Sequence, residues 1–452
     1  MSTSHADTAP RPLRAHAGGA LNGRIRVPGD KSISHRALIL GALSVGRTRI
    51  SGLLEATDVL NTAKVVTALG ARAERDADGW LVTGRGLGGL RTPADALDFG
   101  NSGTGSRLMM GVVAGEDVTA CFTGDASLCK RPMGRVLRPL QQMGLEILEA
   151  GRETLPLTLK GTSQLVPMTY TLPVASAQVK SAILLAGLHA AGTTTVIEPT
   201  PTRDHTERMF RHFGADIAIA PSGSGRAISV RGQTELIARD VTVPGDPSSA
   251  AFLAAAALLV PGSEVTIEGV LTNPTRTGLY TTLLEMGADL AFENEREQGG
   301  EPVADLRVRH SRLTGVTVPA ERAPSMIDEY PILAVLAAFA DGETRMEGLA
   351  ELKVKESDRL AATAAGLTAN GVTARVEDDR LVVTGSPTVT GGGLVITHMD
   401  HRIAMAFLVM GLASAAPVTV DDVSFVATSF PEFEGLVAEI GGRLAPAGET
   451  RP

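Results

Sequence analysis

The feature that most constrains the fold of this chain is a pattern of helix, glycine and strand that occurs six times. In each copy an amphipathic segment ends in a glycine, and a strand-like alternation follows, as in Leu283-Leu-Glu-Met-Gly287 and Ala288-Asp-Leu-Ala-Phe. The glycines lie 70 to 84 residues apart, at Gly70, Gly144, Gly214, Gly287, Gly371 and Gly441. A glycine at this place is typical of a helix C-terminus that needs a left-handed residue. One copy would indicate only a generic α/β protein, but six nearly even copies predict true repetition.

A second repetition divides the six repeats into two groups of three. The segment Val27-Pro-Gly-Asp-Lys-Ser32 recurs as Val243-Pro-Gly-Asp-Pro-Ser248, and an alanine- and leucine-rich helix is expected after each copy. We therefore predict two α/β domains of three repeats each. The N-terminal domain is expected to comprise residues 23–242, and the C-terminal domain residues 1–22 and 243–452. The chain should cross between the domains near residues 22 and 243, and the last repeat should lie close to the N-terminal strand.

Composition excludes several classes of function. The chain has 452 residues, of which 43% are hydrophobic and 20% charged, as in ordinary globular proteins. Aromatic residues make up only 3% and the net charge is −8, so no surface for nucleic acid or for an anionic membrane is expected. The two cysteines, Cys121 and Cys129, cannot form a disulfide framework and favour the cytoplasm. The apolar runs are too short to span a bilayer. Residues 1–17 are too polar for a secretory signal, and a frayed tail is expected.

Residues 28–36, Pro-Gly-Asp-Lys-Ser-Ile-Ser-His-Arg, lie between an expected strand and an expected helix. Backbone N–H groups at a helix start attract anions, and Lys31, Ser32 and Arg36 add further donors. The spacing of a Walker A phosphate loop is missing. From this segment alone, an anion site and a group of solvated surface charges are equally good interpretations.

Two further segments of the first half combine glycine or arginine with an expected helix start. Residues 99–107, Phe-Gly-Asn-Ser-Gly-Thr-Gly-Ser-Arg, let backbone approach a ligand closely, but a plain turn would need the same glycines. Arg131 lies at a helix start, and Arg131, Arg135 and Arg138 are expected on one helical stripe, which is usually solvated. Polar residues also open two later helices, where helix caps are the simpler interpretation: residues 176–178 and 203–208.

The second half of the chain supplies the carboxylates. Asp328 stands in an otherwise apolar entry to a helix. In a helix, Lys355 and Arg359 would share one face beside Glu356. Arg402 opens a further apolar helix. Ion pairs on an open surface would contribute little, but the apolar flanks of these segments favour the rim of a site.

Five of these segments, in this order along the chain, resemble motifs of the enolpyruvyl-transferase family: P-G-D-K-S-I-S-H-R, F-G-N-S-G-T-G-S-R, K-R-P-M-G-R, V-K-E-S-D-R-L and D-H-R-I-A-M. The resemblance runs from about residue 21 to about residue 444 and is closest to the 3-phosphoshikimate 1-carboxyvinyltransferases (5-enolpyruvylshikimate-3-phosphate synthases) of the second bacterial class. It implies a two-domain inside-out α/β barrel with six βαβαββ repeats, three per domain, in which helices lie inside and sheets outside. A two-strand hinge joins the domains, and the active site is expected in the interdomain cleft.

The resemblance also implies the reaction. The enolpyruvyl group of phosphoenolpyruvate moves to the 5-hydroxyl of shikimate 3-phosphate through a tetrahedral intermediate, and phosphate leaves. This step belongs to the shikimate pathway of aromatic amino-acid biosynthesis. No organic cofactor and no metal is expected, and the enzyme is expected to be a cytoplasmic monomer that binds only these two small substrates.

The resemblance implies a role for each matching residue. The residues expected to bind shikimate 3-phosphate are Lys31, Ser32, Arg36, Ser176, Ala177, Gln178, Arg203, Asp328 and Lys355. Those expected to bind phosphoenolpyruvate are Lys31, Gly103, Arg131, Gln178, Arg359 and Arg402. Asp328 is the expected base for the hydroxyl, whereas Glu356 and Lys31 are rival acids for C3 of phosphoenolpyruvate. Arginine suits bidentate binding of phosphate and carboxylate groups.

Three positions depart from the pattern of many relatives. Thr428 stands where they have a lysine, which puts one contact to phosphoenolpyruvate or to the closed enzyme in doubt. Ala177 replaces a second serine, so only its backbone can contact a ligand. Leu108 replaces a proline common in other relatives. This third departure bears on glyphosate: Gly103, the smallest residue at a wall of the expected phosphoenolpyruvate pocket, predicts inhibition by this compound, and Leu108 weakens that prediction.

Three other functions fit the pattern less well. Transfer of the enolpyruvyl group to UDP-N-acetylglucosamine uses a loop cysteine, but Ala126 stands at that place and Cys129 is displaced by three positions. A non-catalytic scaffold would not need every carboxylate and arginine of the site. A nucleotide cyclase would need a phosphate loop or a catalytic histidine motif, and we expect His35 and His401 to be structural or to orient the substrate.

Overall fold

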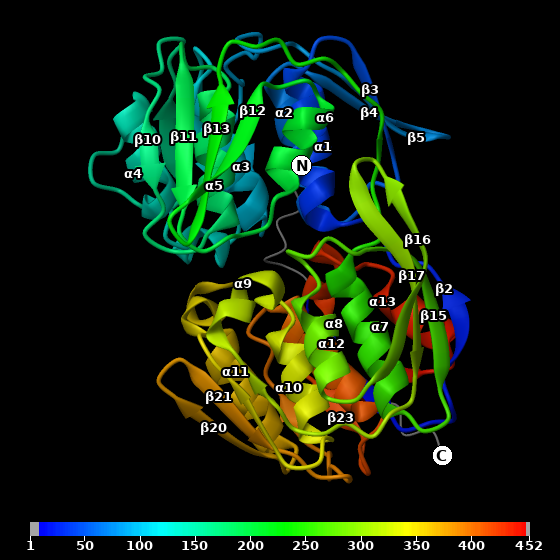
Figure 1. Ribbon diagram of the computed structural model, residues 1–452. Coiled ribbons are helices and arrows are strands. Elements are labelled where there is room, and N and C mark those ends of the chain that lie inside the picture. The colour runs from blue at the N-terminus through cyan, green and yellow to red at the C-terminus, as the bar shows by residue number, and fades with distance from the viewer. Residues whose placement is uncertain (1–8, 449–452) are drawn as a thin grey trace. The chain divides into compact units, whose positions relative to one another are not determined.

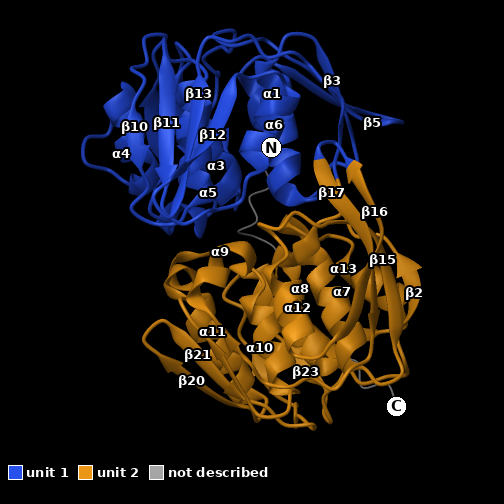
Figure 2. Ribbon diagram, viewed as in Figure 1, with its two compact units in different colours: residues 1–7, 29–243, 298–300 blue, residues 8–28, 244–297, 301–452 orange. Residues whose placement is uncertain are grey.

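The computed structural model describes residues 9–448, drawn in Figure 1. In this part of the chain two compact units are distinguished, and Figure 2 shows which residues form each. Unit 1 comprises residues 29–243 and 298–300, and unit 2 comprises residues 9–28, 244–297 and 301–448. Each unit contains three mixed sheets of four strands.

One sheet of unit 1 shows the repeat in its simplest form. The chain runs through β10 (Thr169–Thr171), α5 (Ala177–Gly187), β11 (Thr193–Glu198), α6 (His205–His212), β12 (Ile217–Ser222) and β13 (Gly225–Arg231). The strand order is β10-β11-β13-β12, in which the first pair is parallel and the other two pairs are antiparallel. This arrangement is the βαβαββ repeat that the resemblance implied.

Two more repeats follow the same order without interruption, one in each unit, with sheet orders β6-β7-β9-β8 and β18-β19-β21-β20. The repeat in unit 1 contains β6 (Leu97–Asp98), α3 (Gly103–Ala114), β7 (Thr119–Thr123), α4 (Gly134–Met143), β8 (Glu146–Ile147) and β9 (Leu157–Lys160). The repeat in unit 2 contains β18 (Thr317–Val318), α9 (Ala323–Met326), α10 (Tyr330–Ala338), β19 (Glu343–Met346), α11 (Arg359–Ala369), β20 (Thr373–Glu377) and β21 (Arg380–Thr384).

In two other repeats the first strands are exchanged. β2 (Asn22–Ile25) pairs in parallel with β15 (Glu264–Leu271) of unit 2, although the helix that follows β2 in the chain belongs to unit 1. Conversely, β14 (Val241–Thr242) pairs in parallel with β3 (Arg47–Ser51) of unit 1. The remaining elements of these two repeats are α1 (Lys31–Leu43), α2 (Thr57–Ala68), β4 (Arg72–Asp76), β5 (Gly79–Thr83), α7 (Pro247–Leu259), α8 (Gly278–Glu285), β16 (Asp289–Gln298) and β17 (Glu301–Arg309). The two Pro-Gly-Asp segments therefore mark two of the places where the chain changes from one unit to the other, and residues 298–300 are a brief further return to unit 1.

The sixth sheet joins the two ends of the described chain. It contains β22 (Leu394–Val395), β23 (Val418–Val420) and β24 (Arg443–Pro446), with α12 (His401–Gly411) and α13 (Phe433–Glu439) between them in the chain. Its remaining strand, β1 (Leu13–His16), lies between β23 and β24 and is antiparallel to both. The expected proximity of the last repeat to the N-terminal strand is thus confirmed.

The expectation of a frayed tail over residues 1–17 is wrong for residues 13–16. Leu13 and Ala15 alternate with more exposed neighbours and are buried in the core of unit 2, at 4% and 0% exposure. Pairing on both sides of β1 and burial of these two side chains hold the segment in place. Residues 1–8, the rest of the expected tail, lie outside the described residues.

The repeat glycines adopt the conformation that their place in the sequence predicts. All six have positive φ angles, between 81° and 121°. Each follows its helix by one or two residues, at the ends of α2, α4, α6, α8, α11 and α13. A side chain at these φ angles would be strained, so glycine is required where each helix turns into the next strand.

The other helix of each repeat forms the core of its unit. These helices are α1, α3 and α5 in unit 1 and α7, α10 and α12 in unit 2. All 13 residues of α7 are buried, which the run of alanines permits because small side chains allow close packing. Within each unit the sheets lie outside these helices (Figure 1), so the helices-inside arrangement is confirmed.

One expected helical stripe is absent. The helix α4 begins at Gly134, and Arg131 precedes it with extended backbone (φ −75°, ψ 138°) after a short 3-10 segment at Leu128–Lys130. Arg131 therefore does not share a stripe with Arg135 and Arg138. Instead it is buried, at 7% exposure.

The helical spacing considered for Lys355 and Arg359 does not occur in the structure. A 3-10 segment at Ala350–Val354 ends before Lys355, and α11 begins only at Arg359. The side chain of Asp358 accepts a hydrogen bond from the backbone N–H of Ala361 at 3.0 Å, and this cap sets the helix start. Lys355 and Arg359 therefore do not lie on one helical face.

In the described part of the chain, every helix falls short of the length and apolar character that crossing a membrane would require.

Candidate active site

Three helices of unit 1 begin with residues of the predicted site. Lys31, Gly103 and Ala177 are the first residues of α1, α3 and α5. The preceding side chains cap the helices: Asp30, Ser102 and Ser176 accept from the N–H groups of Ile33, Gly105 and Val179 at 2.8, 3.0 and 3.4 Å. The cap interpretation of Ser176 is thus confirmed. Helix N-termini with free N–H groups attract anions, so these three starts are suited to phosphate and carboxylate groups.

His35, in the second turn of α1, connects that helix with the middle of α2 and with the start of α3. Its Nδ1 lies 2.8 Å from Thr62 Oγ1, and its Nε2 lies 3.5 Å from Ser102 Oγ. Complete burial, together with the nearby charges of Lys31 and Arg36, holds the pKa of His35 well below its ordinary value. The imidazole is therefore neutral, and its contacts indicate the structural role that we expected.

Lys31 and Arg36 extend from α1 to different elements. Lys31 Nζ forms an ion pair with Asp58 in the first turn of α2. The guanidinium of Arg36 is almost completely buried and is held by α1, α5 and the start of α6. Its acceptors are Ser32 O, Ser181 Oγ and Thr206 Oγ1, at 3.0, 2.8 and 2.8 Å.

Arg131 lies beside Gly103 at the start of α3. Its Nη2 donates to Asn101 Oδ1 at 2.6 Å and to Ser127 Oγ at 3.1 Å. A Cβ atom on Gly103 would lie 3.0 Å from Arg131 Nη1 and 3.2 Å from Arg107 Nη1. The glycine therefore allows two guanidinium groups to approach the first turn of the helix.

Arg107 also lies beside Gly103, although the sequence did not predict it as a residue of the site. Its Nη1 donates to Gln178 Oε1 at 2.7 Å, and Gln178 Nε2 donates to Thr104 Oγ1 at 3.0 Å. Because a guanidinium can only donate, the orientation of the Gln178 amide follows from this contact. The glycine-rich segment contained Arg107, but its partner lies 71 residues away in the chain, and no local pattern signals that pairing.

The other predicted residues of unit 1 are half-buried. Ser32, Ala177 and Arg203 lie at or just before the starts of α1, α5 and α6. Lys180 differs, because its side chain is completely buried and contacts Glu198 and Glu207 at 3.1 and 2.7 Å. Two glutamates of unit 1 thus surround the ammonium group, and Lys180 is not a candidate for ligand binding.

In unit 2, Arg359 is surrounded by carboxylates. It is completely buried and donates to Asp400 through Nε at 2.7 Å and Nη2 at 3.3 Å, and to Asp328 through Nη1 at 3.1 Å. Glu356 forms a further ion pair with it. Burial acts to lower the pKa of Arg359, but the charges of Asp400, Glu356 and Asp328 outweigh it and raise that pKa. The interpretation as a surface ion-pair run is therefore wrong, because the central cation has no exposure.

Asp400 holds this arrangement together. It is completely buried and accepts hydrogen bonds from Ser357 Oγ and from the backbone N–H of Arg402, both at 3.0 Å. The second contact caps α12, and Arg359 donates to both oxygens of the same carboxylate. Asp400 lay in a recognised motif, but its position did not reveal that it anchors an arginine 41 residues away.

Asp328 and Glu356 lie around the same arginine. Asp328 stands between α9 and α10, as the apolar helical entry predicted, and its Oδ1 also accepts from Lys355 Nζ at 3.3 Å. The side chains of Asp328 and Glu356 are 13% and 21% exposed, so both have limited access to solvent. The structure thus brings together the two carboxylates that were predicted for proton transfer, together with Lys355.

Arg402 follows the cap of α12 and turns towards the same segment. Its Nη1 donates to the backbone oxygen of Asp328 at 3.3 Å and lies 3.6 Å from Glu329 Oε1. Its side chain is 13% exposed. Arg402 therefore belongs to the group of unit 2, and Glu329 is a neighbour that sequence reasoning missed.

Thr428, the position where many relatives have a lysine, is buried at 4% exposure. Its Oγ1 donates to the backbone oxygen of Phe425 at 2.6 Å, within the 3-10 segment Ser424–Thr428. The hydroxyl group of Thr428 thus donates its proton to a backbone oxygen three residues earlier in the chain.

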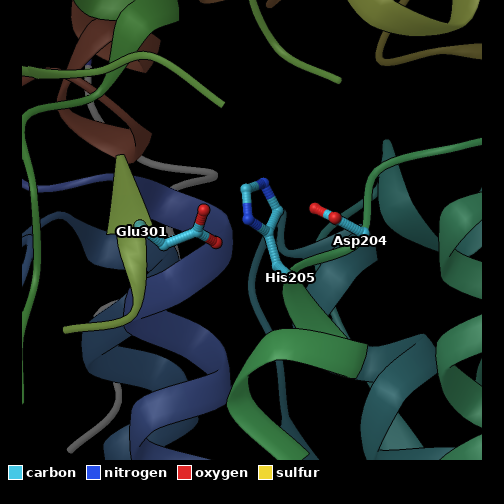
Figure 3. A group of neighbouring side chains, drawn as sticks. All are labelled: Asp204, His205 and Glu301. Carbon is cyan, nitrogen blue, oxygen red and sulfur yellow. The ribbon is translucent and has the colours of Figure 1, made fainter. Parts of the chain in front are cut away.

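Figure 3 shows Asp204 and His205 at the beginning of α6, and Glu301 at the beginning of β17. These are residue types that bind metals. Asp204 accepts a hydrogen bond from Arg208 Nε at 3.0 Å within unit 1, and Glu301 accepts one from Asn273 Nδ2 at 2.9 Å within unit 2. The two carboxylates thus have protein partners within their own units, and we assign no metal site to these residues.

Comparison with known proteins agrees with this geometry. A sequence model of the EPSP synthase (3-phosphoshikimate 1-carboxyvinyltransferase) family matches residues 15–436. The chain is 64% identical over 445 residues to the 3-phosphoshikimate 1-carboxyvinyltransferase of Methylobacterium sp. (strain 4-46). The aligned region covers 97% of this chain and 99% of that protein. It is 63% identical over 434 residues to the enzyme of the same name from Parvibaculum lavamentivorans, with coverage of 95% and 96%.

Solved structures lead to the same family. The EPSP synthase of Acinetobacter baumannii superimposes with a TM-score of 0.84 at 43% identity, over 96% of this chain and 100% of that chain. The enolpyruvyl transferase NikO from Streptomyces tendae has a TM-score of 0.77 at 20% identity, over 98% of this chain and 100% of that chain, and shows a shared fold alone. The repeat architecture, the grouped arginines and carboxylates and these similarities show that the chain belongs to the EPSP synthase family.

Proposed function

We propose that this chain transfers the enolpyruvyl group of phosphoenolpyruvate to the 5-hydroxyl of shikimate 3-phosphate and releases phosphate. This is the activity named by its family and by its relatives at 60–64% identity. The observation that carries the assignment is the buried Arg359, which is anchored by Asp400 and flanked by Asp328 and Glu356. The reaction places the chain in the shikimate pathway, which supplies the aromatic amino acids.

Phosphoenolpyruvate carries a phosphate and a carboxylate, and the proposed binding residues supply matching cations. Arg131 lies at the start of α3 beside Gly103, and Arg359 and Arg402 lie at the starts of α11 and α12. Arginine binds both groups in bidentate fashion and keeps its charge when buried. Lys31 and Gln178, at the starts of α1 and α5, complete the proposed set.

Shikimate 3-phosphate is assigned mainly to unit 1. The starts of α1, α5 and α6 present hydroxyls, amides and cations of the kind that bind a phosphate and a polyhydroxylated ring. The proposed residues in unit 1 are Lys31, Ser32, Arg36, Ser176, the backbone of Ala177, Gln178 and Arg203. Unit 2 contributes Asp328 and Lys355, which contact each other at 3.3 Å.

The proton transfers are assigned to the carboxylates of unit 2. Asp328 takes the proton of the 5-hydroxyl, whose oxygen attacks C2 of phosphoenolpyruvate while C3 is protonated. Glu356 is the proposed acid for C3, and Lys31 is the alternative. When the tetrahedral intermediate expels phosphate, C3 returns its proton and the enol ether of the product forms. Fixed cations near the developing charges account for much of the rate.

The proposal divides the work between the two parts of the chain. The domain of residues 23–242 binds shikimate 3-phosphate, and the domain of residues 1–22 and 243–452 supplies the carboxylates and two of the arginines. We further propose that the protein acts as a cytoplasmic monomer. Cys121 and Cys129 are both free thiols, which supports a reducing compartment.

The assay that tests the function measures phosphate release from phosphoenolpyruvate by the purified full chain. We expect release with shikimate 3-phosphate and none with UDP-N-acetylglucosamine. Release with the sugar nucleotide alone, or with neither acceptor from folded protein, would contradict the proposal.

Variants of the two carboxylates test the assigned roles. Asp328→Asn and Glu356→Gln are each expected to reduce kcat by at least about 100-fold, the usual effect of removing a general acid or base. Isotope exchange at C3 of phosphoenolpyruvate distinguishes the acids, because it should fail in Glu356→Gln if Glu356 protonates C3 and persist if Lys31 does. Glu285→Gln is the matched control, since Glu285 pairs with Arg322 on the surface of the same unit.

A further inference from the structure

We propose that Glu329 is a positioning residue that holds Arg402 in place for phosphoenolpyruvate binding. This inference rests on the proposed function, in which Arg402 contacts that substrate. Glu329 follows Asp328 directly in the chain and is 3% exposed. Arg402 Nη1 lies 3.6 Å from Glu329 Oε1 and donates to the backbone oxygen of Asp328 at 3.3 Å, so two neighbouring residues hold the Nη1 end of the guanidinium.

A directed set of hydrogen bonds holds the Glu329 carboxylate. Ser248 Oγ lies within hydrogen-bond distance of Glu329 Oε1, and Arg276 Nη2 lies 3.1 Å from the same Ser248 oxygen. Because a guanidinium cannot accept, Ser248 accepts from Arg276 and donates its proton to Glu329. Asp246 in turn binds Arg276 at 3.3 Å and caps α7. The path therefore runs from the start of α7 to Arg402.

The sequence repetition explains why a serine stands at this place. Asp246 and Ser248 belong to the second Pro-Gly-Asp segment, in the positions that Asp30 and Ser32 occupy in the first. Both aspartates cap the helix that follows them. Pro247 replaces the cation Lys31, and Ser248 is only 3% exposed and turns to Glu329. One loop type is thus assigned to substrate binding in unit 1 and to holding an arginine in unit 2.

The second carboxylate oxygen indicates that Glu329 is retained for its charge. Glu329 Oε2 is buried and has no hydrogen-bond partner among residues 9–448. A buried carboxylate with an unsatisfied oxygen is costly, so a purely structural role would be better filled by a neutral side chain. The benefit lies in the neighbouring cation, Arg402.

Positioning and simple charge compensation predict opposite effects for Glu329→Gln. Removing a negative charge beside Arg402 would by itself strengthen the binding of an anionic substrate. Loss of positioning weakens it, because the guanidinium can then leave its bound orientation. We expect the KM for phosphoenolpyruvate to rise about tenfold, as for directly coupled neighbours. The kcat and the KM for shikimate 3-phosphate should change less than about threefold.

Ser248→Ala separates the hydrogen bond from the charge. It keeps the Glu329 side chain but removes the donor to Oε1, and we expect a smaller rise of about threefold in the KM for phosphoenolpyruvate. Ser414→Ala is the matched control, because Ser414 is also a buried serine of unit 2, and its Oγ donates to Met410 O at 2.7 Å. Thermal denaturation of each variant checks that the fold is intact.

A double-mutant cycle with Arg402→Gln decides the inference. If Glu329 acts through Arg402, Glu329→Gln should have no further effect on the KM for phosphoenolpyruvate in the Arg402→Gln background. An equal effect in both backgrounds, or a lower KM in Glu329→Gln alone, would overturn the positioning role. An unchanged KM in Arg402→Gln alone would instead remove the proposed function of Arg402, and the two failures are therefore distinguishable.

Discussion

Replacing Gly103 by alanine should separate the stability of the first helical turn of α3 from the binding of phosphoenolpyruvate. Gly103 is the first residue of α3, and its φ angle is not positive, so alanine fits the backbone. Alanine is preferred over glycine in helices by up to about 1 kcal/mol. The free energy of unfolding should therefore stay the same or rise slightly.

The added methyl group acts on two guanidinium groups. It would lie 3.0 Å from Arg131 Nη1 and 3.2 Å from Arg107 Nη1, both closer than most Cβ contacts, so the arginines must move by a few tenths of an ångström. A hydrogen bond to a charged group contributes about 1.5–3 kcal/mol, and partial loss of one such bond costs about 1 kcal/mol. The KM for phosphoenolpyruvate should then rise roughly fivefold. The inhibition constant of glyphosate, predicted for the same pocket, should rise as well.

Steady-state kinetics with phosphoenolpyruvate as the varied substrate, combined with urea denaturation, measures both effects. Gly435→Ala is the matched control, because Gly435 lies in α13 and a Cβ there meets nothing within 4 Å. It should stabilise the protein without changing the kinetics. An unchanged KM in Gly103→Ala, or an equal rise in Gly435→Ala, would refute the reasoning.

Three other changes test separate parts of the structure. Asp400→Asn removes one of the carboxylates around the buried Arg359 and should lower the free energy of unfolding by about 3 kcal/mol in urea denaturation; a loss below about 1 kcal/mol would contradict its anchoring role. Burial raises the pKa of Glu116 from 4.5 to about 7, so Glu116 contributes stability that is complete below pH 4.5 and is lost as the pH rises through 7, by up to about 3 kcal/mol. Unfolding free energies between pH 5 and 8 should therefore fall less steeply in Glu116→Gln, and equal slopes would disprove the assignment. Thr428→Val should leave the KM for phosphoenolpyruvate within about threefold, because its hydroxyl bonds to Phe425 O, and a larger rise would show that Thr428 replaces the lysine of other relatives.

Local patterns predicted the repeat and several helix starts, such as those of α1 and α12, because the residues that define them are neighbours in the chain. The repeat glycines, such as Gly287, signal the end of a helix by their own backbone requirement. Asp328 and Arg402 stand at the edges of apolar helices, as the apolar residues around them in the sequence predicted. The position of Lys355 could not be predicted in this way. Helical spacing alone does not show that Asp358 caps α11, so that the helix begins only after Lys355.

Contacts between distant residues could not be predicted in this way. Arg359 bonds to Asp400 at a separation of 41 residues, and Ser248 bonds to Glu329 at a separation of 81. Such partners are set by the packing of repeats, which no short motif encodes. For β2 and β14, the repeated Pro-Gly-Asp segment predicted that the chain crosses nearby, but it did not identify β15 and β3 as their partner strands.

The position of β1 and β2 has a consequence for the order in which the protein forms on the ribosome. Both strands are made first, yet their partners in the sheets, β15, β23 and β24, are made only after residue 263. Residues 29–243 meanwhile form nearly all of unit 1 as one continuous stretch. Domains generally fold as units during synthesis, so the emerging chain can complete unit 1 while its first two strands wait unpaired. Unit 2 can close its last sheet only when residues 443–446 have left the ribosome.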